Sequence, residues 1–405
     1  MAPRALCGLM LILLAAAVCG AASAQEAPSP IDAPLPPVAF PQWRRVESLT
    51  GPAEYRASFP SAFVSGVPNN DTVHLSVFLP EDRPGPYPAV VVLHYLGADD
   101  LRPTRLLAEE LNGRGIAAVL LTLPYHIQRT PPGARSGEMA LSDEPARIRD
   151  VVVQSVLDVR RTLDFLSTRP EIARSSLGIT GISLGAVIAS LAYSVDPRLQ
   201  RAAIVLGGGD LAHILWHSSL TGPTREAMRR RGLDLEALRR ELAVVEPLSR
   251  VASRTDGRAF LVGARFDTVI PAEDVRKLAE ALPNATTLWL DTGHYGGVFV
   301  QRRVARAVAS FFGEEFAGRT FVAPTRFYAP TVRLGLLGDS ADGFQVGAGL
   351  DLFRIGSARG WIGAALATPN GAKAFLGYQA GPSLGAGLTL GSEGPSAAFF
   401  WSVVL

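Results

Sequence analysis

Short apolar segments that alternate with helix-type segments are the feature that most restricts how this chain can fold. The runs AVVVLHY (89–95), IAAVLLTLP (116–124) and AAIVLG (202–207) hold few polar side chains. Such runs are typical of strands that are covered on both faces. Helical periodicity lies between them, as over 145–168 and 184–195. This alternation predicts an α/β fold with a mostly parallel sheet between two layers of helices.

The alternation extends from about residue 57 to residue 312, with one interruption. TVHLSVFLP (72–80) alternates as an antiparallel strand does. The interruption, at about 208–250, is a helical and charge-rich insertion between two predicted core strands. It is open whether this insertion covers a site as a lid or is a solvated surface excursion.

The character of the sequence changes after Gly318. The segment 331–405 is rich in glycine and poor in charged residues, and apolar and polar residues alternate over 344–352. The same period recurs at 384–390 and 397–405, so we expect a glycine-rich antiparallel β-meander of about five or six strands. Too few strands are present to close a single-chain membrane barrel of about eight strands.

The amino-terminal residues 1–24 are predicted to be a secretory signal, with Arg4, a short apolar run and the small residues ASA at 22–24. The protein is therefore expected to be exported, to the periplasm or outside the cell. Cys7 and Cys19 both fall in this segment, so the mature protein would hold no disulfide or reactive thiol. Lipid attachment at Cys19 is disfavoured by the bulky Val18 before it.

These patterns divide the chain into four parts. We expect a signal peptide at 1–24, an extended proline-rich leader at 25–45, an α/β domain at 46–318 and the β-meander module at 319–405.

Charge and motif content exclude several classes of partner. A formal net charge of +2 gives no basic surface for nucleic acid. No cofactor motif is present. His213, Trp216 and His217 share a helical face, but without an apparent third ligand they are interpreted as packing and solvated residues and not as a metal site. The sequence does not indicate the oligomeric state.

Ser183 is the candidate nucleophile. It is the centre of GISLG (181–185), which follows an apolar strand segment and begins a helical one. A serine hydroxyl is a poor nucleophile unless an adjacent base removes its proton. A sharp strand-to-helix turn exposes the hydroxyl, and tiny residues two positions before and after it let strand and helix pass closely.

The acid and the base should follow in that order, each just beyond a later strand. Asp267 comes a few residues after the apolar run 259–264, and His294 comes just after 286–290. Asp291 is the rival acid, but it lies close to the histidine on the same strand and would have to reach backwards.

Two backbone N–H groups are expected to stabilise the oxyanion, those of Leu184 and Tyr95. Tyr95 lies in LHYLGADD (93–100), where His94 is interpreted as a residue that fixes the turn. In the segment 125–144, Tyr125, His126 and Arg129 either line a substrate pocket or only anchor a long loop.

Residues 57–312 resemble the α/β-hydrolase superfamily, and within it the esterase and dienelactone-hydrolase-like groups. The matching pieces are HYLG (94–97), GISLG (181–185), RFDTVIP (265–271) and DTGHYGG (291–297). The resemblance implies acyl transfer by Ser183, Asp267 and His294 on a small-molecule ester, as in carboxylesterases. The chain departs from the pattern in having Tyr95 where glycine is common. Dienelactone hydrolases use cysteine as nucleophile, so the serine favours esterases.

Three further interpretations stay open. The chain could be an envelope structural or binding protein with a catalytically silent hydrolase-like part, or a peptidase. The meander of 319–405 could be a soluble packing module, or it could associate with the outer membrane or envelope.

Overall fold

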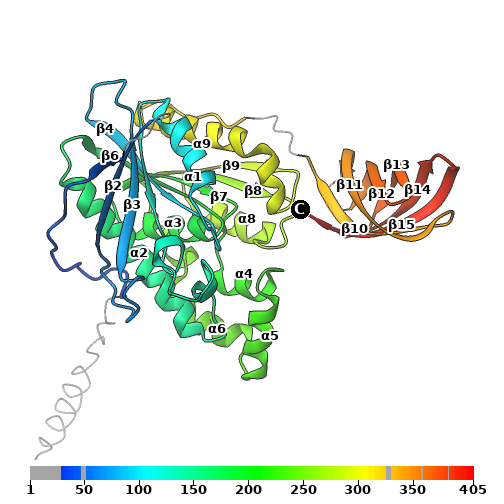
Figure 1. Ribbon diagram of the computed structural model, residues 1–405, viewed down its shortest axis with the longest axis horizontal. Helices are drawn as coiled ribbons and strands as arrows, with labels where there is room; N and C mark the ends of the chain where they lie inside the picture. The colour runs from blue at the N-terminus through cyan, green and yellow to red at the C-terminus, as the bar shows by residue number, and fades with distance from the viewer. Residues whose placement is uncertain (1–28, 47–51, 325–329, 357–358, 382) are drawn as a thin grey trace, which may run out of the picture.

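The computed structural model describes residues 29–46, 52–324, 330–356, 359–381 and 383–405. An α/β part is followed by a smaller β-barrel that projects from it (Figure 1). The predicted signal peptide, with Cys7 and Cys19, lies outside the described residues.

Nine strands of the described chain form one sheet, in the order β1-β2-β3-β5-β4-β6-β7-β8-β9. The pairs from β5 to β9 are parallel, and β1, β2 and β3 pair antiparallel at one edge. The mostly parallel sheet that the sequence predicts is thus confirmed. The strands are β1 (Arg44–Val46), β2 (Ala53–Pro60), β3 (Thr72–Leu79), β4 (Tyr87–Leu93), β5 (Ala117–Leu121), β6 (Ile172–Ile182), β7 (Leu199–Val205), β8 (Arg258–Ala264) and β9 (Ala285–Leu290).

Helices cover both faces of the sheet. Leucine, valine and phenylalanine side chains of α1 (Arg102–Asn112) and α9 (Gln301–Phe316) form one apolar cluster with the sheet. The cluster on the other face holds side chains of α2 (Pro145–Ser167), α3 (Leu184–Val195) and α8 (Ala272–Ala281). None of the described helices has both the length and the apolar character needed to cross a bilayer.

The insertion between β7 and β8 packs on the α/β core in part. Its helices are α4 (Leu211–His217), α5 (Gly222–Arg230), α6 (Leu235–Leu242) and α7 (Leu248–Val251), with a short 3-10 turn, η3 (Ala243–Val245). Met228, Leu238 and Leu242 are buried in the same cluster as α2 and α3. The insertion is therefore more than a solvated excursion.

The proline-rich leader also packs against the α/β part. Ile31 is fully buried, and the ring of Phe40 contacts Phe59 and Phe165. Arg160 of α2 donates to the carbonyl oxygens of Ile31 and Ala33, at 2.8 and 2.7 Å. The described part of the leader begins with a turn at 30–33, and these contacts hold it against the α/β part.

Six antiparallel strands follow, and in the described residues they close into a barrel because β10 pairs with β15. They are β10 (Val332–Asp339), β11 (Gly343–Gly356), β12 (Gly360–Thr368), β13 (Gly371–Gln379), β14 (Leu384–Gly391) and β15 (Gly394–Val404). The antiparallel meander is confirmed, but the expectation that so few strands would not close is wrong.

Glycine explains how so small a barrel closes. Strands of a narrow barrel bend sharply, and a Cβ at several inward positions would collide with a neighbouring strand. A Cβ on Gly335 would lie 2.1 Å from the carbonyl oxygen of Trp401, and one on Gly387 would lie 2.3 Å from that of Leu376. The glycines therefore allow the strands to curve tightly enough for the barrel to close. The number of strands alone does not reveal this.

Candidate active site

Ser183 lies on the strained turn that the sequence predicts. It joins the end of β6 to the start of α3 with φ of +54° and ψ of −115°. A positive φ is rare for a residue that carries a Cβ, so the surrounding structure must enforce it. The turn places the hydroxyl at the end of the sheet, above the central strands.

Close packing at two glycines enforces this geometry. A Cβ on Gly181 would lie 2.1 Å from the carbonyl oxygen of Gly185. A Cβ on Gly185 would lie 2.5 Å from the carbonyl oxygen of His94. The start of α3 therefore presses on the end of β4, and the same contact positions both the serine and the loop after β4.

The structure brings together Ser183, Asp267 and His294. The imidazole Nε2 of His294 is 3.0 Å from Oγ of Ser183, and its Nδ1 is 2.7 Å from Oδ2 of Asp267. Ser183 and Asp267 are buried, and the side chain of His294 is 9% exposed. An imidazole held between a carboxylate and a hydroxyl can take the hydroxyl proton while the carboxylate stabilises the resulting charge.

The Asp267 carboxylate is itself held in place. Its Oδ1 accepts the backbone N–H groups of Val269 and Ile270, both at 2.8 Å, so Oδ2 is directed at His294. The rival acid, Asp291, instead pairs with Arg265 at 2.8 Å, and its side chain is 60% exposed. The geometry thus favours Asp267 as the partner of the histidine.

The predicted oxyanion donors lie beside the serine. Leu184 is the first residue of α3, where backbone N–H groups have no partner within the helix. Tyr95 lies in the loop after β4, and Tyr95, Leu96 and Gly97 line the same pocket as Ser183 and His294.

Two buried histidines fix the loop that carries Tyr95. The Nδ1–H of His94 donates to the carbonyl oxygen of Tyr95 at 2.8 Å, and its Nε2 accepts the N–H of Leu123 at 3.0 Å. The Nδ1–H of His126 donates to the carbonyl of Pro124, and its Nε2 accepts the N–H of Gly97 at 3.0 Å. Since each ring uses both nitrogens, His94 and His126 hold the loop in position and do not face substrate.

Both rings are neutral at physiological pH. Burial, together with the nearby His126, lowers the pKa of His94 to about 3. Burial also lowers the pKa of His126 to about 4. One nitrogen of each ring therefore remains an acceptor, as the N–H groups of Leu123 and Gly97 require.

The triad opens into a large apolar cleft of about 1040 Å³. Its wall includes Leu206 after β7, Leu220 of the insertion, and Val304 and Val308 of α9. Between β5 and α2, the segment 134–138 and Leu141 contribute another side of the wall. Leu220 is the residue of the described insertion that reaches the cleft, so the insertion forms part of its rim.

Tyr125, His126 and Arg129, for which the sequence left both pocket lining and loop anchoring open, do not line the described cleft. Arg129 is fully buried and forms an ion pair with Asp158 at 2.8 Å, and His126 holds Gly97 as described. Tyr125 is also absent from the described cleft wall, and its backbone N–H donates to Asn70 at 2.8 Å. These three residues anchor the loop, the alternative that the sequence left open.

A group of side chains with the right types for a metal lies elsewhere, at the insertion. Asp210, His213 and Asp274 come together there without His217, a group that the sequence did not reveal because Asp274 is distant in the chain. Nζ of Lys277 lies 3.0 Å from Asp210 and 2.9 Å from Asp274. The guanidinium of Arg239 also lies 3.2 Å from Asp210, so two cations balance the two carboxylates and the group is an ion-pair cluster.

Comparison with known proteins agrees with the fold. Residues 32–243, just over half of the chain, match the model of the family described as "Alpha/beta hydrolase domain containing 18". An uncharacterized protein of Mycobacterium tuberculosis is 29% identical over 309 residues, which cover 69% of this chain and 68% of that protein.

The comparison with solved structures returns hydrolases. An acetyl xylan esterase from Paenibacillus sp. R4 is 20% identical with a TM-score of 0.54, and the match covers 67% of this chain and 88% of the esterase. A 2,6-dihydroxy-pseudo-oxynicotine hydrolase is 21% identical with a TM-score of 0.47, over 68% of this chain and 71% of that one.

Proposed function

Because the chain belongs to the alpha/beta hydrolase domain containing 18 family, we propose that it is a serine hydrolase that cleaves carboxylic esters through an acyl-enzyme. One observation carries the proposal: His294 lies between Oγ of Ser183, at 3.0 Å, and Oδ2 of Asp267, at 2.7 Å. Intact geometry of this kind favours a working enzyme over a catalytically silent binding protein.

The proposed reaction has two halves. Nε2 of His294 takes the proton of Ser183 as the hydroxyl oxygen attacks the ester carbonyl, and Asp267 stabilises the imidazolium. The alcohol leaves with that proton, which gives the acyl-enzyme. Water then attacks the acyl carbonyl with His294 again as base, and the acid leaves as the serine regains its proton.

The oxyanion of each tetrahedral intermediate would be bound by the backbone N–H groups of Leu184 and Tyr95. The position of the Tyr95 N–H depends on His94 and His126, which fix the carbonyl of Tyr95 and the N–H of Gly97. Donors fixed before reaction require no reorganisation when charge develops, which is why such donors lower a barrier.

The character of the cleft favours an ester with an apolar part. Leu206, Leu220, Val304 and Val308 present hydrocarbon to the bound molecule, and charged side chains of Asp99, Arg135 and Glu138 also line the cleft. Apolar side chains favour the binding of an acyl or alkyl chain, because binding removes that chain from water.

Labelling with a fluorophosphonate tests the nucleophile. The wild-type chain should be labelled and should hydrolyse short-chain p-nitrophenyl esters, and Ser183→Ala should do neither. Ser190→Ala is the matched control, because that buried hydroxyl donates to Val187 within α3. Equal labelling of wild type and Ser183→Ala, or an unlabelled wild type, would remove the proposal and favour the silent-protein alternative.

We also propose that the protein is exported, on the basis of the charged start, apolar run and ASA site of residues 1–24. Amino-terminal sequencing of protein recovered from the cell envelope should then begin at Gln25. Recovery of the chain with Met1 in the cytosol would contradict the proposal.

A further inference from the structure

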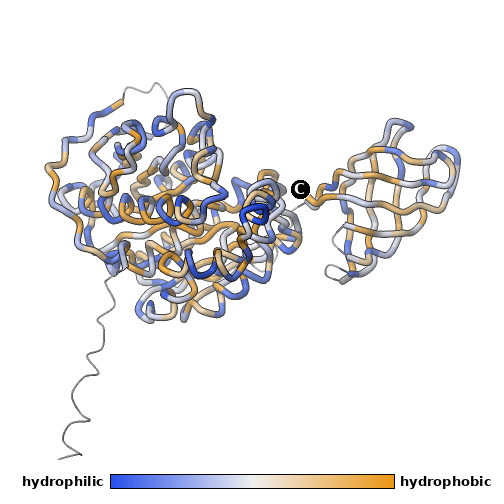
Figure 2. Tube along the Cα trace, turned by 90° about the horizontal axis from the view of Figure 1, so that it is seen from below, coloured by the Kyte–Doolittle hydropathy of each residue, from blue (hydrophilic) through white to orange (hydrophobic). Residues whose placement is uncertain are grey.

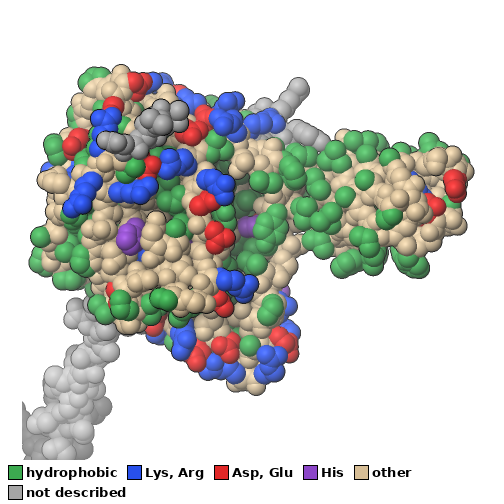
Figure 3. All heavy atoms as spheres, viewed as in Figure 1, with side chains coloured by type: hydrophobic (Ala, Val, Ile, Leu, Met, Phe, Trp, Pro, Cys, Tyr) green, Lys and Arg blue, Asp and Glu red, His purple; other side chains and the backbone are tan. Residues whose placement is uncertain are grey.

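The outer wall of the barrel is apolar on every strand. Figure 3 shows hydrophobic side chains over the projecting barrel, and Figure 2 shows hydrophobic residues along its strands. Large side chains that are more than a third exposed stand on all six described strands. They are Leu334, Leu336, Phe344, Val346, Leu350, Leu352, Phe353, Ile355, Trp361, Leu376, Tyr378, Leu384, Leu388, Leu390, Phe399, Trp401 and Val403.

Charged side chains of the described strands are turned into the barrel instead. Arg333 pairs with Asp351 at 2.8 Å, with side chains that are 4% and 5% exposed. Lys373 pairs with Asp339 at 2.9 Å, with side chains that are 8% and 0% exposed. Arg354, at the mouth, pairs with Asp351 and is 11% exposed. The burial pattern is thus the reverse of that expected in water.

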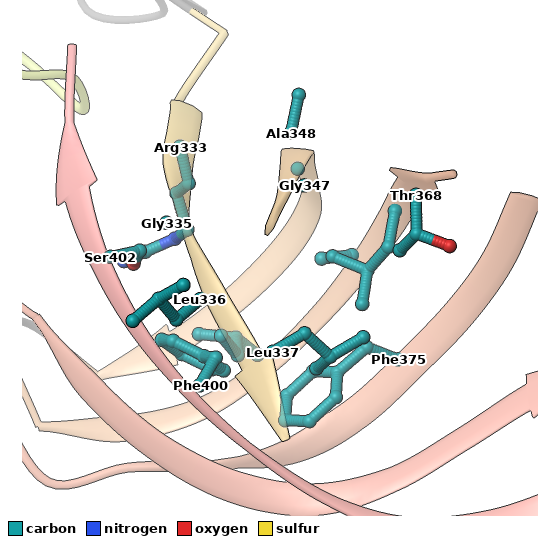
Figure 4. Close-up of a pocket in the computed structure, with 14 residues that line it drawn as sticks. Arg333, Gly335, Leu336, Leu337, Gly347, Ala348, Thr368, Phe375, Phe400 and Ser402 are labelled. Atoms are coloured by element: carbon teal, nitrogen blue, oxygen red, sulfur yellow. Dashed lines mark hydrogen bonds between the residues drawn. The ribbon is translucent and has the colours of Figure 1, made fainter. Parts of the chain in front are cut away.

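The interior is filled and is not a channel. Phe375 and Phe400 meet inside the barrel with ring centroids 5.3 Å apart, below the Arg333 guanidinium (Figure 4). The space that remains among these side chains measures about 40 Å³. The barrel therefore offers its outer surface, and not its lumen, to a partner.

Aromatic side chains lie toward both ends of the wall. Trp361 and Tyr378 pair across β12 and β13 at the end that adjoins the α/β part, and Trp401 lies near the same end of β15. Phe344 and Phe399 contact each other toward the opposite end. Indole and phenol groups at the edge of an apolar band are typical of the boundary between lipid and water.

The height of the wall suits a bilayer. A nine-residue strand such as β12 extends about 30 Å at ~3.3 Å per residue, which gives roughly 23 Å across the membrane at a tilt of ~40°. The outward apolar band of membrane barrels is about 25 Å tall. Closure also leaves no unpaired strand edge, as hydrocarbon requires.

We propose that this outer wall inserts among the acyl chains of a lipid bilayer and anchors the protein to it. A second copy of the chain would cover one side of the barrel, whereas the apolar side chains surround it. Lipid is the partner that can contact all six strands at once. Along the strands, apolar side chains that face outward alternate with side chains that face an ion-paired interior. This arrangement distinguishes a membrane barrel from a soluble one.

The anchor would also place the hydrolase cleft near the membrane surface. Tyr295, Val298 and Phe299, in the turn that follows His294, are each more than half exposed. The backbone of Leu405, just after β15, accepts the N–H of Gly293 at 2.9 Å, so this turn adjoins the Trp361 end of the barrel. In Figure 3 hydrophobic side chains continue from the α/β part onto the barrel.

Flotation with vesicles of dioleoylphosphatidylcholine tests the anchor. The chain from Gln25 onward, refolded with vesicles, should float with them, and dibromo-phosphatidylcholine should quench its tryptophan fluorescence. Trp361→Phe combined with Trp401→Phe should float equally but lose most of that quenching. This comparison requires no destabilising change.

Charged substitutions in the middle of the outer wall provide a second test of membrane insertion. Leu376 and Leu388 face each other across β13 and β14, with 53% and 59% exposure. Leu376→Lys or Leu388→Lys should lower vesicle partition by about tenfold or more, given the cost of a cation in hydrocarbon. Ser392→Lys, in the exposed turn between β14 and β15, is the matched control and should float like wild type.

The outcome does not depend on hydrolase activity, because Ser183→Ala should float as well as wild type. Wild-type protein that stays out of the vesicle fraction as a detergent-free monomer would overturn the proposal. A discrete oligomer without quenching by the brominated lipid would also overturn it, and would assign the wall to a second copy of the chain.

Discussion

Asp267 uses its two carboxylate oxygens for different purposes. Oδ1 accepts two backbone N–H groups of its own turn, and Oδ2 accepts the Nδ1–H of His294. The turn thus orients the carboxylate, and the carboxylate orients the ring. At this scale the proposed catalysis depends on a fixed tautomer, in which Nε2 is free to accept the serine proton.

Replacing Asp267 by asparagine should therefore lower kcat by about 10³–10⁴-fold, because an amide can donate to Nδ1 and stabilise the wrong tautomer. Steady-state hydrolysis of a p-nitrophenyl ester measures the loss. Asp291→Asn, which removes only the exposed pair with Arg265, should stay within about twofold of wild type. A comparable loss in both variants would show that the acid is misassigned.

The loop after β4 is the element whose position most depends on buried polar groups. His94 and His126 pack edge to face with centroids 4.8 Å apart, and each accepts a backbone N–H. Protonation would convert each acceptor into a donor and place a charge in a buried site. The loop is therefore sensitive to acid through these rings.

Stability should consequently fall as the pH falls. The pKa of His126 is about 4 in the folded protein and near its ordinary 6.5 when unfolded. Its contribution is complete above about pH 6.5 and is lost as pH falls toward 4, because only the unfolded chain binds the proton there. The slope is about 1.4 kcal/mol per pH unit for each such ring.

Urea unfolding at pH 7 and pH 5 measures this dependence. His126→Gln should be less stable than wild type at pH 7 but should lose less stability between the two pH values, since one ring no longer titrates. An identical decrease in both proteins would contradict the role given to the buried ring.

Sequence alone predicts the elements whose signals are local. Ser183, Asp267 and His294 each follow an apolar run, so the parallel sheet brings them to one edge. The contact of His126 with Gly97 was missed, because it joins two loops that no short pattern connects. Closure of the barrel was missed for a similar reason, since it depends on β10 meeting β15.

At the scale of the whole molecule, the barrel and the α/β part meet at the loops that carry the triad. Leu405 accepts hydrogen bonds from the N–H of Gly293 at 2.9 Å and from the hydroxyl of Thr292 at 3.2 Å. The Arg354 guanidinium lies 4.2 Å from the ring centroid of Phe266, the neighbour of Asp267. These contacts between the barrel and the α/β part therefore help to position Asp267 and His294.

Gly293→Ala tests this coupling. Its Cβ would lie 2.5 Å from the carbonyl oxygen of Val404, so either the loop or β15 must shift. We expect kcat to fall by roughly ten- to a hundredfold, the range that a displacement of ~1 Å produces. Gly297→Ala is the control, because its Cβ would make an ordinary contact at 3.5 Å with Leu206. Wild-type turnover by Gly293→Ala would mean that the barrel does not influence the site.

Much of the cleft wall comes from parts of the chain that carry neither nucleophile, acid nor base. Leu141 and Leu220 belong to connections that surround the cleft, apart from the close packing of α3 against the end of β4. A library of variants at these positions can therefore reshape what fits while the reacting atoms keep their places. A hydrolase that works as proposed would therefore be a scaffold for engineering selectivity separately from turnover.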